Sequence, residues 1–294
     1  KLKNMTDNKN IRSLEQEGST NNQNNNVLPN NQPDQGLVNC LKGTFPGVKL
    51  RAVTTFFITV CVVVFIITKI MEVTQETTTW TCILYKAQAK YTYAITRKGQ
   101  VQRLILPMFL HAGISHLLFN MLSLLMIGYY IESLCNRKLH FTLLMFLSGI
   151  AGNVMSALAS TESVGVGISG AIFGLLGCYL AYVIFNRDIL PGWKRRLVSY
   201  GFIMLINIIW SLGGQNIDFF AHLGGFVIGL AMSGFVLKPR GEGDPAMPNP
   251  KRYRLFKIAS LIFIAAYFLI FGIAMFARPI PHCEGTDACE RICE

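Results

Sequence analysis

The sequence predicts an all-α polytopic membrane protein, in which a core of six transmembrane helices is followed by one C-terminal transmembrane helix. Hydrophobic residues make up 51% of the 294 residues and charged residues only 15%, a composition too apolar for an ordinary soluble domain. Seven apolar runs are long enough to cross a bilayer. Basic residues gather in alternate connections between these runs, as the positive-inside rule describes for multispanning proteins.

Residues 1–48 form a polar tail ahead of the first apolar run. Its stretch STNNQNNNVLPNNQPDQG is rich in Asn, Gln, Pro and Gly, and a segment with so little to bury is expected to be disordered. No apolar core follows a basic start, so the tail does not resemble a signal peptide. Because the chain begins with Lys1, we expect it to be a piece of a longer product.

The expected spans are about 20 residues long, the length that a rise of about 1.5 Å per residue requires to cross the hydrocarbon. The second run is longer than this, so its first part is expected to lie outside the membrane, and the fifth is short. The runs are 52–71, 104–131, 141–160, 167–186, 196–213, 217–237 and 255–277. The domains that follow are a core over 49–237, a cytosolic linker over 238–254, the seventh span and a Cys-containing tail over 278–294.

The charge of the connections predicts the orientation of the helices. Lys and Arg precede the first span and lie between spans 2 and 3, 4 and 5, and 6 and 7, whereas the connections STESVG and GGQNID contain neither. The N-terminus is therefore expected in the cytosol and the C-terminus in a lumen or outside the cell. Residues 72–103 are the exception, because they carry five basic residues on the expected outer side. The formal charge of +11 follows from these connections, so we expect a lipid bilayer as partner and no nucleic acid.

Four of the eight cysteines fall on the expected outer side, namely Cys82, Cys283, Cys289 and Cys293. An oxidising compartment favours at least one disulfide among them, and four cysteines allow three pairings that spacing does not distinguish. A zinc site in the tail would have only His282 as a nearby histidine, so no metal or other cofactor is expected.

Polar side chains occur in three of the expected spans. Ser169 opens span 4, His222 lies near the start of span 6, and His116 and Asn120 share one face of span 2. All three spans enter the membrane from the expected outer side, so these residues should lie at similar depth. Polar groups inside spans are candidates for function.

The chemistry of these four residues is complementary. A serine hydroxyl beside an imidazole is a nucleophile with its general base, and a histidine and an amide could stabilise an oxyanion. The first backbone N–H groups of span 4, at Gly167–Gly170, could add a donor. Asp218 lies one turn before His222 but faces the outer boundary, which favours a Ser–His dyad over a triad.

Pairs of glycines predict that spans 4 and 6 approach closely. Gly170 and Gly174 are four residues apart, as are Gly225 and Gly229, and small residues at this spacing let helix backbones touch. Taken singly, a serine that bonds to its own helix or a packed histidine would be structural. Their common depth favours catalysis.

These motifs resemble the rhomboid family of intramembrane serine proteases. The matching stretches are GISG around Ser169, AHLGGFVIG around His222 and FLHAGISHLLFNM around His116 and Asn120, within roughly residues 50–237. The resemblance implies that Ser169 and His222 are catalytic, that His116 and Asn120 bind the oxyanion, and that Phe173 stacks on His222. Many members carry a Trp-Arg pair in the first outer connection, which is not found here, although Arg103 resembles the family.

The resemblance further implies hydrolysis of peptide bonds in or near the transmembrane helix of single-span membrane proteins. The seventh span is similar to the six-plus-one arrangement of eukaryotic members of the secretory pathway or plasma membrane. Two alternatives remain open. One is a catalytically inactive relative that binds and routes membrane proteins, and the other is a seven-span receptor or transporter.

Overall fold

The computed structural model describes residues 52–75, 79–187, 190–213, 218–237, 250–279 and 291–293. The predicted tail over 1–48 and most of the predicted linker over 238–254 lie outside these residues. Within the described residues the secondary structure is helical, and β pairing is limited to two isolated bridges. The predicted all-α fold class is confirmed.

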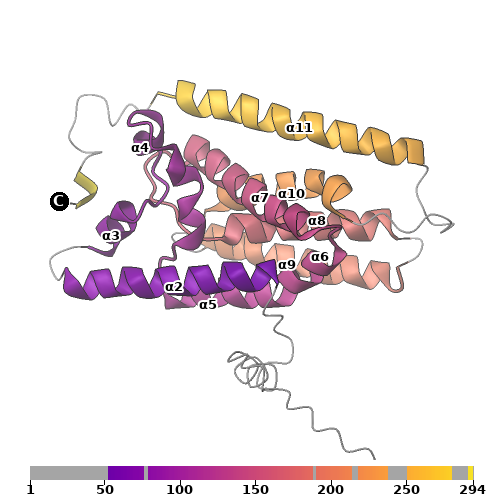
Figure 1. Ribbon diagram of the computed structural model, residues 1–294, viewed down its shortest axis with the longest axis horizontal. Coiled ribbons are helices and arrows are strands. Elements are labelled where there is room, and N and C mark those ends of the chain that lie inside the picture. Colours follow the sequence, from indigo (N-terminus) through magenta and orange to yellow (C-terminus); the bar gives the residue numbers. More distant parts are fainter. Residues whose placement is uncertain are drawn as a thin grey trace, which may run out of the picture. The chain divides into compact units, whose positions relative to one another are not determined.

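Each predicted apolar run contains one or more helices (Figure 1). Those that match single runs are α2 (Val53–Thr74), α7 (Lys138–Ala159), α8 (Ser169–Phe185), α9 (Trp193–Gly213), α10 (Phe219–Val236) and α11 (Pro250–Ala277). The second run contains α5 (Ile114–Ser123), the π-helical turn η3 (Leu124–Gly128) and α6 (Tyr129–Leu134). The end of the predicted linker is thus already helical, because α11 begins at Pro250, where proline is favoured in the first helical turn.

Five segments of the described chain are long and apolar enough to cross a membrane. They are Val53–Thr74, Ile114–Leu134, Lys138–Ala159, Phe219–Val236 and Arg254–Ala277. The helix α8 is apolar but has 17 residues, and α9 begins with the basic residues Lys194, Arg195 and Arg196. The chain is a multi-pass membrane protein, and passage of α8 and α9 through the bilayer stays a prediction.

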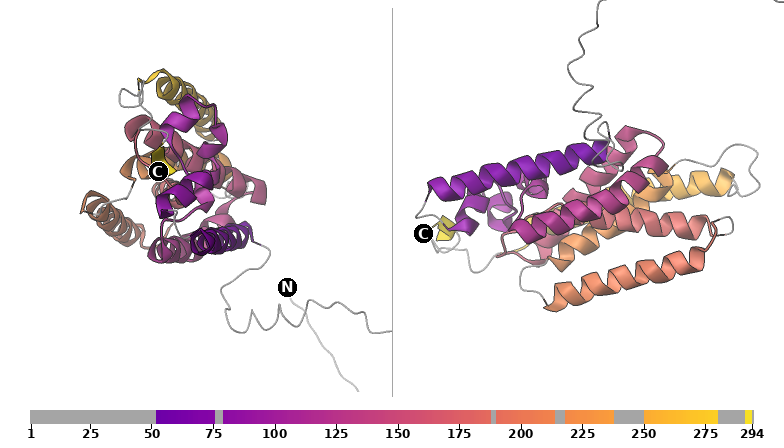
Figure 2. Two further views of the ribbon diagram at one scale, coloured as in Figure 1. Left: turned by 90° about the vertical axis from the view of Figure 1, so that its left-hand side faces the viewer. Right: turned by 90° about the horizontal axis from the view of Figure 1, so that it is seen from below.

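The helix α8 packs against both α7 and α10 near the centre of the bundle, and α7 and α10 also pack against each other (Figure 1). It is apolar on all sides, and a helix of that kind is stable only when it is surrounded. The helix α11 lies along α7 and α10, and the buried Tyr267 donates a hydrogen bond of 2.9 Å to the carbonyl of Ala151. The helix α9 lies at the edge of the bundle, against α8 (Figure 2).

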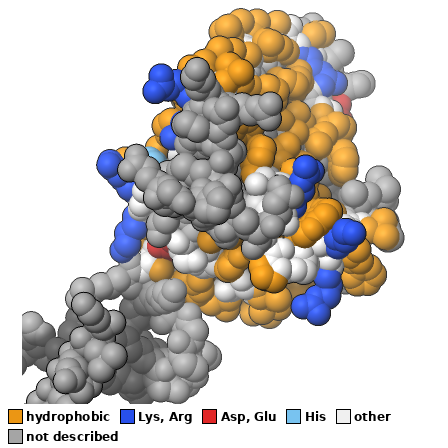
Figure 3. All heavy atoms as spheres, turned by 90° about the vertical axis from the view of Figure 1, so that its right-hand side faces the viewer, with side chains coloured by type: hydrophobic (Ala, Val, Ile, Leu, Met, Phe, Trp, Pro, Cys, Tyr) orange, Lys and Arg blue, Asp and Glu red, His pale blue; other side chains and the backbone are white. Residues whose placement is uncertain are grey.

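The connections between helices meet at two separate ends. At one end Lys90 and Gly165 exchange backbone hydrogen bonds, which joins two segments predicted to lie outside. At the other end Cys135 pairs with Leu237, where connections predicted to be cytosolic begin. Figure 3 faces the end at which α11 begins, and Lys and Arg side chains stand around its apolar surface. The predicted outer and inner connections therefore gather at opposite ends of the helices.

The connection after α2 is folded into short helices. These are α3 (Trp80–Lys86), α4 (Thr92–Thr96), and the 3₁₀ turns η1 (Val101–Leu104) and η2 (Leu106–Phe109). Arg103 is 2% exposed and donates to the carbonyls of Tyr85 and Ala89 at 2.9 and 2.8 Å. Lys90 is fully buried. Two of the five basic residues that violated the predicted charge pattern are thus inside the protein, where they stabilise this connection.

A disulfide joins this connection to the C-terminal tail. Cys82 in α3 is bonded to Cys293, which supplies a pairing that the sequence left open. Cys283 and Cys289 lie outside the described residues, and within those residues Cys61, Cys135 and Cys178 are buried and form no disulfide. The bond ties the chain after α11 to the same end of the molecule as residues 79–110.

Candidate active site

Ser169 and His222 meet at the starts of two neighbouring helices. Ser169 is the first residue of α8, and His222 lies in the first turn of α10. Nε2 of His222 is 2.9 Å from Oγ of Ser169, a hydrogen-bonding distance. The ring of Phe173, one turn after the serine, stacks on His222 at 4.1 Å between centroids and 6° between planes. The stacked ring fixes the plane of the imidazole.

The carboxylate of Asp218 makes no hydrogen bond to the imidazole of His222. It caps α10, because its Oδ1 accepts a hydrogen bond of 3.0 Å from the N–H of Ala221, and its Oδ2 accepts from the hydroxyl of Ser156. Nδ1 of His222 is buried, and no described residue hydrogen-bonds to it. The structure therefore brings a serine and a histidine together without a carboxylate on the second nitrogen.

The closeness of Ser169 and His222 depends on contact between helix backbones. A Cβ added at Gly225 would overlap the carbonyl group of Gly170, and one at Gly229 would overlap that of Gly174. A Cβ at Gly174 would in turn overlap the side chain of Ser148 in α7. Since no rotamer change can move a backbone carbonyl, Gly225 and Gly229 accept only glycine at this helix separation.

His116 and Asn120 approach the chain just before Ser169. A Cβ added at Gly167 would lie 2.9 Å from Nε2 of His116 and 3.7 Å from Nδ2 of Asn120. Nδ1 of His116 accepts a hydrogen bond of 3.4 Å from the N–H of Ala112, which assigns the ring proton to Nε2. Nδ2 of Asn120 is buried, and no described residue accepts from it. Two N–H donors therefore lie beside Gly167, two residues before Ser169.

The role of Gly167 in this site differs from the predicted one. Its backbone N–H donates to the carbonyl of Pro107 at 2.9 Å, so the expectation that it offers an open donor is wrong. Its φ angle of 121° is one that side-chain-bearing residues rarely adopt. The absence of a side chain leaves room for His116.

His111 is a further residue of this site that the sequence did not single out, because a spacing of five residues from His116 is not that of one helix face. The helix α5 begins only at Ile114, so helical spacing does not apply to residue 111. The His111 side chain is fully buried, and its ring centroid lies 5.2 Å from that of His116. It supports the ring of His116 from the side.

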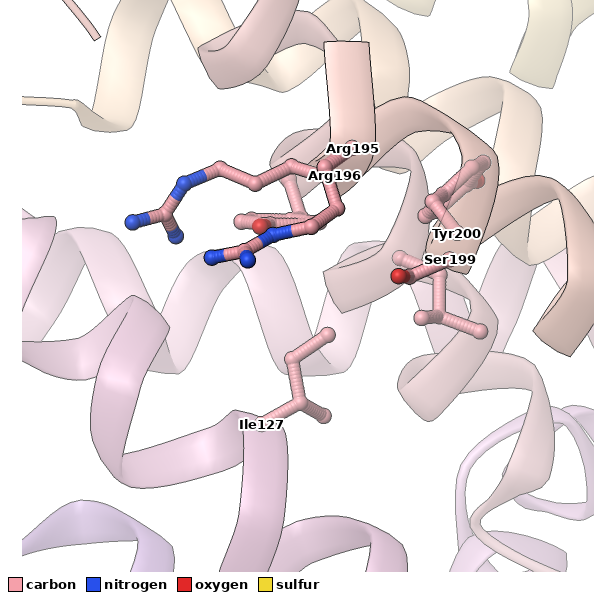
Figure 4. A pocket seen from close by; sticks show the side chains of 7 residues that line it. Ile127, Arg195, Arg196, Ser199 and Tyr200 are labelled. Carbon is pink, nitrogen blue, oxygen red and sulfur yellow. The ribbon is translucent and has the colours of Figure 1, made fainter. Parts of the chain in front are cut away.

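A separate pocket lies beside α9. A cavity of about 190 Å³ separates α9 from η3 and α8, and Arg195, Arg196, Ser199 and Tyr200 line one side of it (Figure 4). Ser169 and His222 are not among its lining residues. In the described part of the chain no group of three or more His, Cys, Asp or Glu side chains is arranged to hold a metal ion.

Comparison with known proteins identifies the family. The model of the Rhomboid domain matches residues 98–239. Rhomboid-like protease 3 of Toxoplasma gondii is 31% identical over 203 residues, which are 69% of this chain and 76% of that protein. RHOMBOID-like proteins 1 and 2 of Arabidopsis thaliana are 34% and 35% identical over 59% and 62% of this chain. The chain belongs to the rhomboid family, and the resemblance drawn from its motifs is confirmed.

This chain spans about half the length of the two Arabidopsis relatives, since the matches cover 48% and 58% of them. Family membership and the apolar helices together make it a multi-pass membrane protein of a hydrolase family that includes proteases.

Proposed function

We propose that this chain is an intramembrane serine endopeptidase that cleaves single-span membrane proteins in or near their transmembrane helix. The observation that carries the proposal is the 2.9 Å contact between Ser169 Oγ and His222 Nε2. Membership of the rhomboid family supports the same reaction class.

In the proposed reaction Oγ of Ser169 attacks the scissile carbonyl carbon while Nε2 of His222 takes the hydroxyl proton. The carbonyl oxygen becomes an oxyanion, to which His116 Nε2–H and Asn120 Nδ2–H are placed to donate. His222 then gives its proton to the leaving amine, which breaks the peptide bond and leaves an acyl-enzyme. Water, deprotonated by His222, hydrolyses the ester and restores Ser169.

The site is proposed to face the lumen or the exterior. It lies at the end of the bundle that holds the predicted outer connections and the Cys82–Cys293 disulfide, and disulfides persist in oxidising compartments. The N-terminus would then be cytosolic and the C-terminus luminal or extracellular. Water would reach Ser169 from the outer aqueous phase.

The test is co-expression with a panel of single-span membrane proteins, comparing the unaltered chain with Ser169→Ala. We expect cleavage only by the unaltered chain, and covalent labelling of Ser169 by a fluorophosphonate. If neither cleavage nor labelling occurs in folded protein, the inactive binding and trafficking relative becomes the better explanation.

A further inference from the structure

A lysine is buried at the end of the molecule that carries Ser169 and His222. Lys90 lies between α3 and α4, and its exposed fraction is 0%. Its Nζ donates to the carbonyl of Ser160 and to Oγ of Ser163, both at 3.2 Å. A buried ammonium group destabilises a protein unless it is hydrogen-bonded and compensated by an opposite charge.

The compensating charge is Asp218, the residue before α10. Gly165 stands between the two, because a Cβ there would lie 2.7 Å from Cε of Lys90 and 3.6 Å from Oδ2 of Asp218. The carboxylate of Asp218 attracts the ammonium group of Lys90. Lys90 therefore holds residues 160–165 from the first outer connection, through Ser160, Ser163 and Gly165. Gly165 also lies beside the carboxylate at the start of α10.

The segments that meet here are those that place the reacting groups. Residues 160–168 lead directly into Ser169. Asp218 begins α10 through its bond to Ala221, and its carbonyl accepts a hydrogen bond of 3.2 Å from the N–H of His222. A displacement at Lys90 would consequently reach both Ser169 and His222.

We propose that Lys90 is a positioning residue, whose buried ammonium group fixes residues 160–168 against the start of α10 and so sets the approach of Ser169 to His222. The proposal rests on the proposed Ser–His chemistry and adds to it a residue from the first outer connection. Lys90 acts through geometry alone, and a misplacement of about 1 Å can lower a rate about a hundredfold.

The charge of Lys90 provides a readout. Burial lowers the pKa of Lys90 from 10.5 to about 8, while Asp218 opposes this shift. The neighbouring Tyr91 has its pKa raised above 10 by burial, by Tyr85 and by Glu162, so it stays neutral where Lys90 titrates. As the pH rises through about 8, Lys90 loses its charge and its attraction to Asp218, and we expect kcat to fall.

Stability changes in the opposite direction. The pKa of Lys90 is lower in the folded chain than its ordinary value, so the unfolded chain binds more protons between these two values. The stability contributed by Lys90 therefore rises with pH in that interval. Deprotonation of Lys90 therefore does not unfold the protein in this pH interval. A fall of kcat there would come from a change in the site and not from loss of folded enzyme.

The experiment compares Lys90→Met and Lys90→Arg in the full chain, with Lys86→Met as a control, because Lys86 is exposed in the same connection. Initial cleavage rates are measured from about pH 6 to about pH 10, per mole of Ser169 that a fluorophosphonate can label. We expect Lys90→Met to lower kcat at neutral pH about tenfold or more with little change in KM, and to lose the alkaline fall. Lys90→Arg should keep most of kcat and also lose the fall, because a guanidinium stays charged.

Wild-type kcat in Lys90→Met, or an unchanged alkaline fall in Lys90→Arg, would overturn the proposal. If neither variant folds, Ser163→Ala removes one acceptor from an exposed residue. It should lower kcat about twofold and move the alkaline fall to lower pH, and an unchanged profile would again overturn the proposal. Failure of the proposed function is distinct, since the unaltered chain would then cleave no more than Ser169→Ala and would not be labelled by the fluorophosphonate.

Discussion

The two halves of the candidate site are held by different means. Ser169 and His222 lie on helices whose backbones touch, because Gly225 and Gly229 face the carbonyls of Gly170 and Gly174. His116 and Asn120 lie on α5, whose other faces expose Ile114, Leu118 and Phe119 by 60, 60 and 63%. A side-chain contact can adjust by a rotamer change, whereas a backbone contact cannot. We therefore expect the serine–histidine half to tolerate less change than the half on α5.

The largest effect is expected at the proposed reacting groups themselves. Ser169→Ala and His222→Ala should each abolish cleavage, because each removes one end of the 2.9 Å contact. Expression and detergent extraction should be unchanged, since the backbone contacts at Gly225 and Gly229 still hold α10 against α8. The measurement is cleavage of a single-span substrate at matched enzyme concentration. Residual activity above about a tenth of wild type in Ser169→Ala would reject its role as nucleophile.

The next largest effect is expected where α10 touches α8. Gly225→Val places bulk against the carbonyl of Gly170, which should push His222 away from Ser169 and lower kcat about a hundredfold. The matched control is Leu230→Val, since Leu230 is 36% exposed on the same helix. Membrane insertion should be intact in both variants, because each places an apolar valine in an apolar helix.

The cleavage rate is measured with thermal melting as the folding control. A folded Gly225→Val enzyme that cleaves at the wild-type rate would show that this glycine does not set the distance between Ser169 and His222. It would also mean that the serine–histidine half of the site tolerates change as well as the half on α5.

A smaller effect is expected on the α5 side. Asn120→Ala removes one of the two side-chain donors near Gly167 and should lower kcat about tenfold to a hundredfold, less than loss of Ser169 or His222, because His116 remains. KM should change little if the contact forms mainly in the transition state. Asn120→Asp is a useful companion, since it keeps the size but replaces the donor by an acceptor. A wild-type rate in Asn120→Ala would make Asn120 a structural residue.

Sequence alone identified the helical class and the pairs of glycines, because both depend on local spacing. The four-residue spacing of Gly225 and Gly229 already indicated a helix face without side chains. Contacts between distant segments were not predictable in this way. Lys90 and Arg103 were assigned to a charged outer loop, yet both are buried. The acceptors of Lys90 are on Ser160 and Ser163, far along the chain. Arg103 donates to the carbonyls of Tyr85 and Ala89, which only the folded connection brings near.

Two local details were also beyond the sequence. His111 lies against His116 because α5 begins only at Ile114, and a helix start is poorly defined where no capping residue marks it. Gly167 donates its N–H to Pro107, a partner that only the folded connection brings near. In both cases the departure occurs in irregular backbone, where periodicity gives no information.

The smallest effect on activity is expected from removal of the disulfide. The bond is linked to the site only through residues that lead to His116 on α5. Cys82 lies in α3, where Trp80 donates a hydrogen bond of 2.7 Å to the carbonyl of Ala112, whose N–H in turn donates to His116. Cys82→Ser/Cys293→Ser should lower the melting temperature by about 5–10 °C, because the bond closes a loop of 211 residues. It should change kcat by less than about threefold, since the Trp80 hydrogen bond persists without the disulfide.

The double variant is compared with Cys293→Ser alone, in which Cys82 is free to pair with another cysteine of the tail. An unchanged melting temperature in the double variant would show that the tail does not stabilise the first outer connection, and a large loss of kcat would mean that the α5 side is held less flexibly than its side-chain contacts indicate.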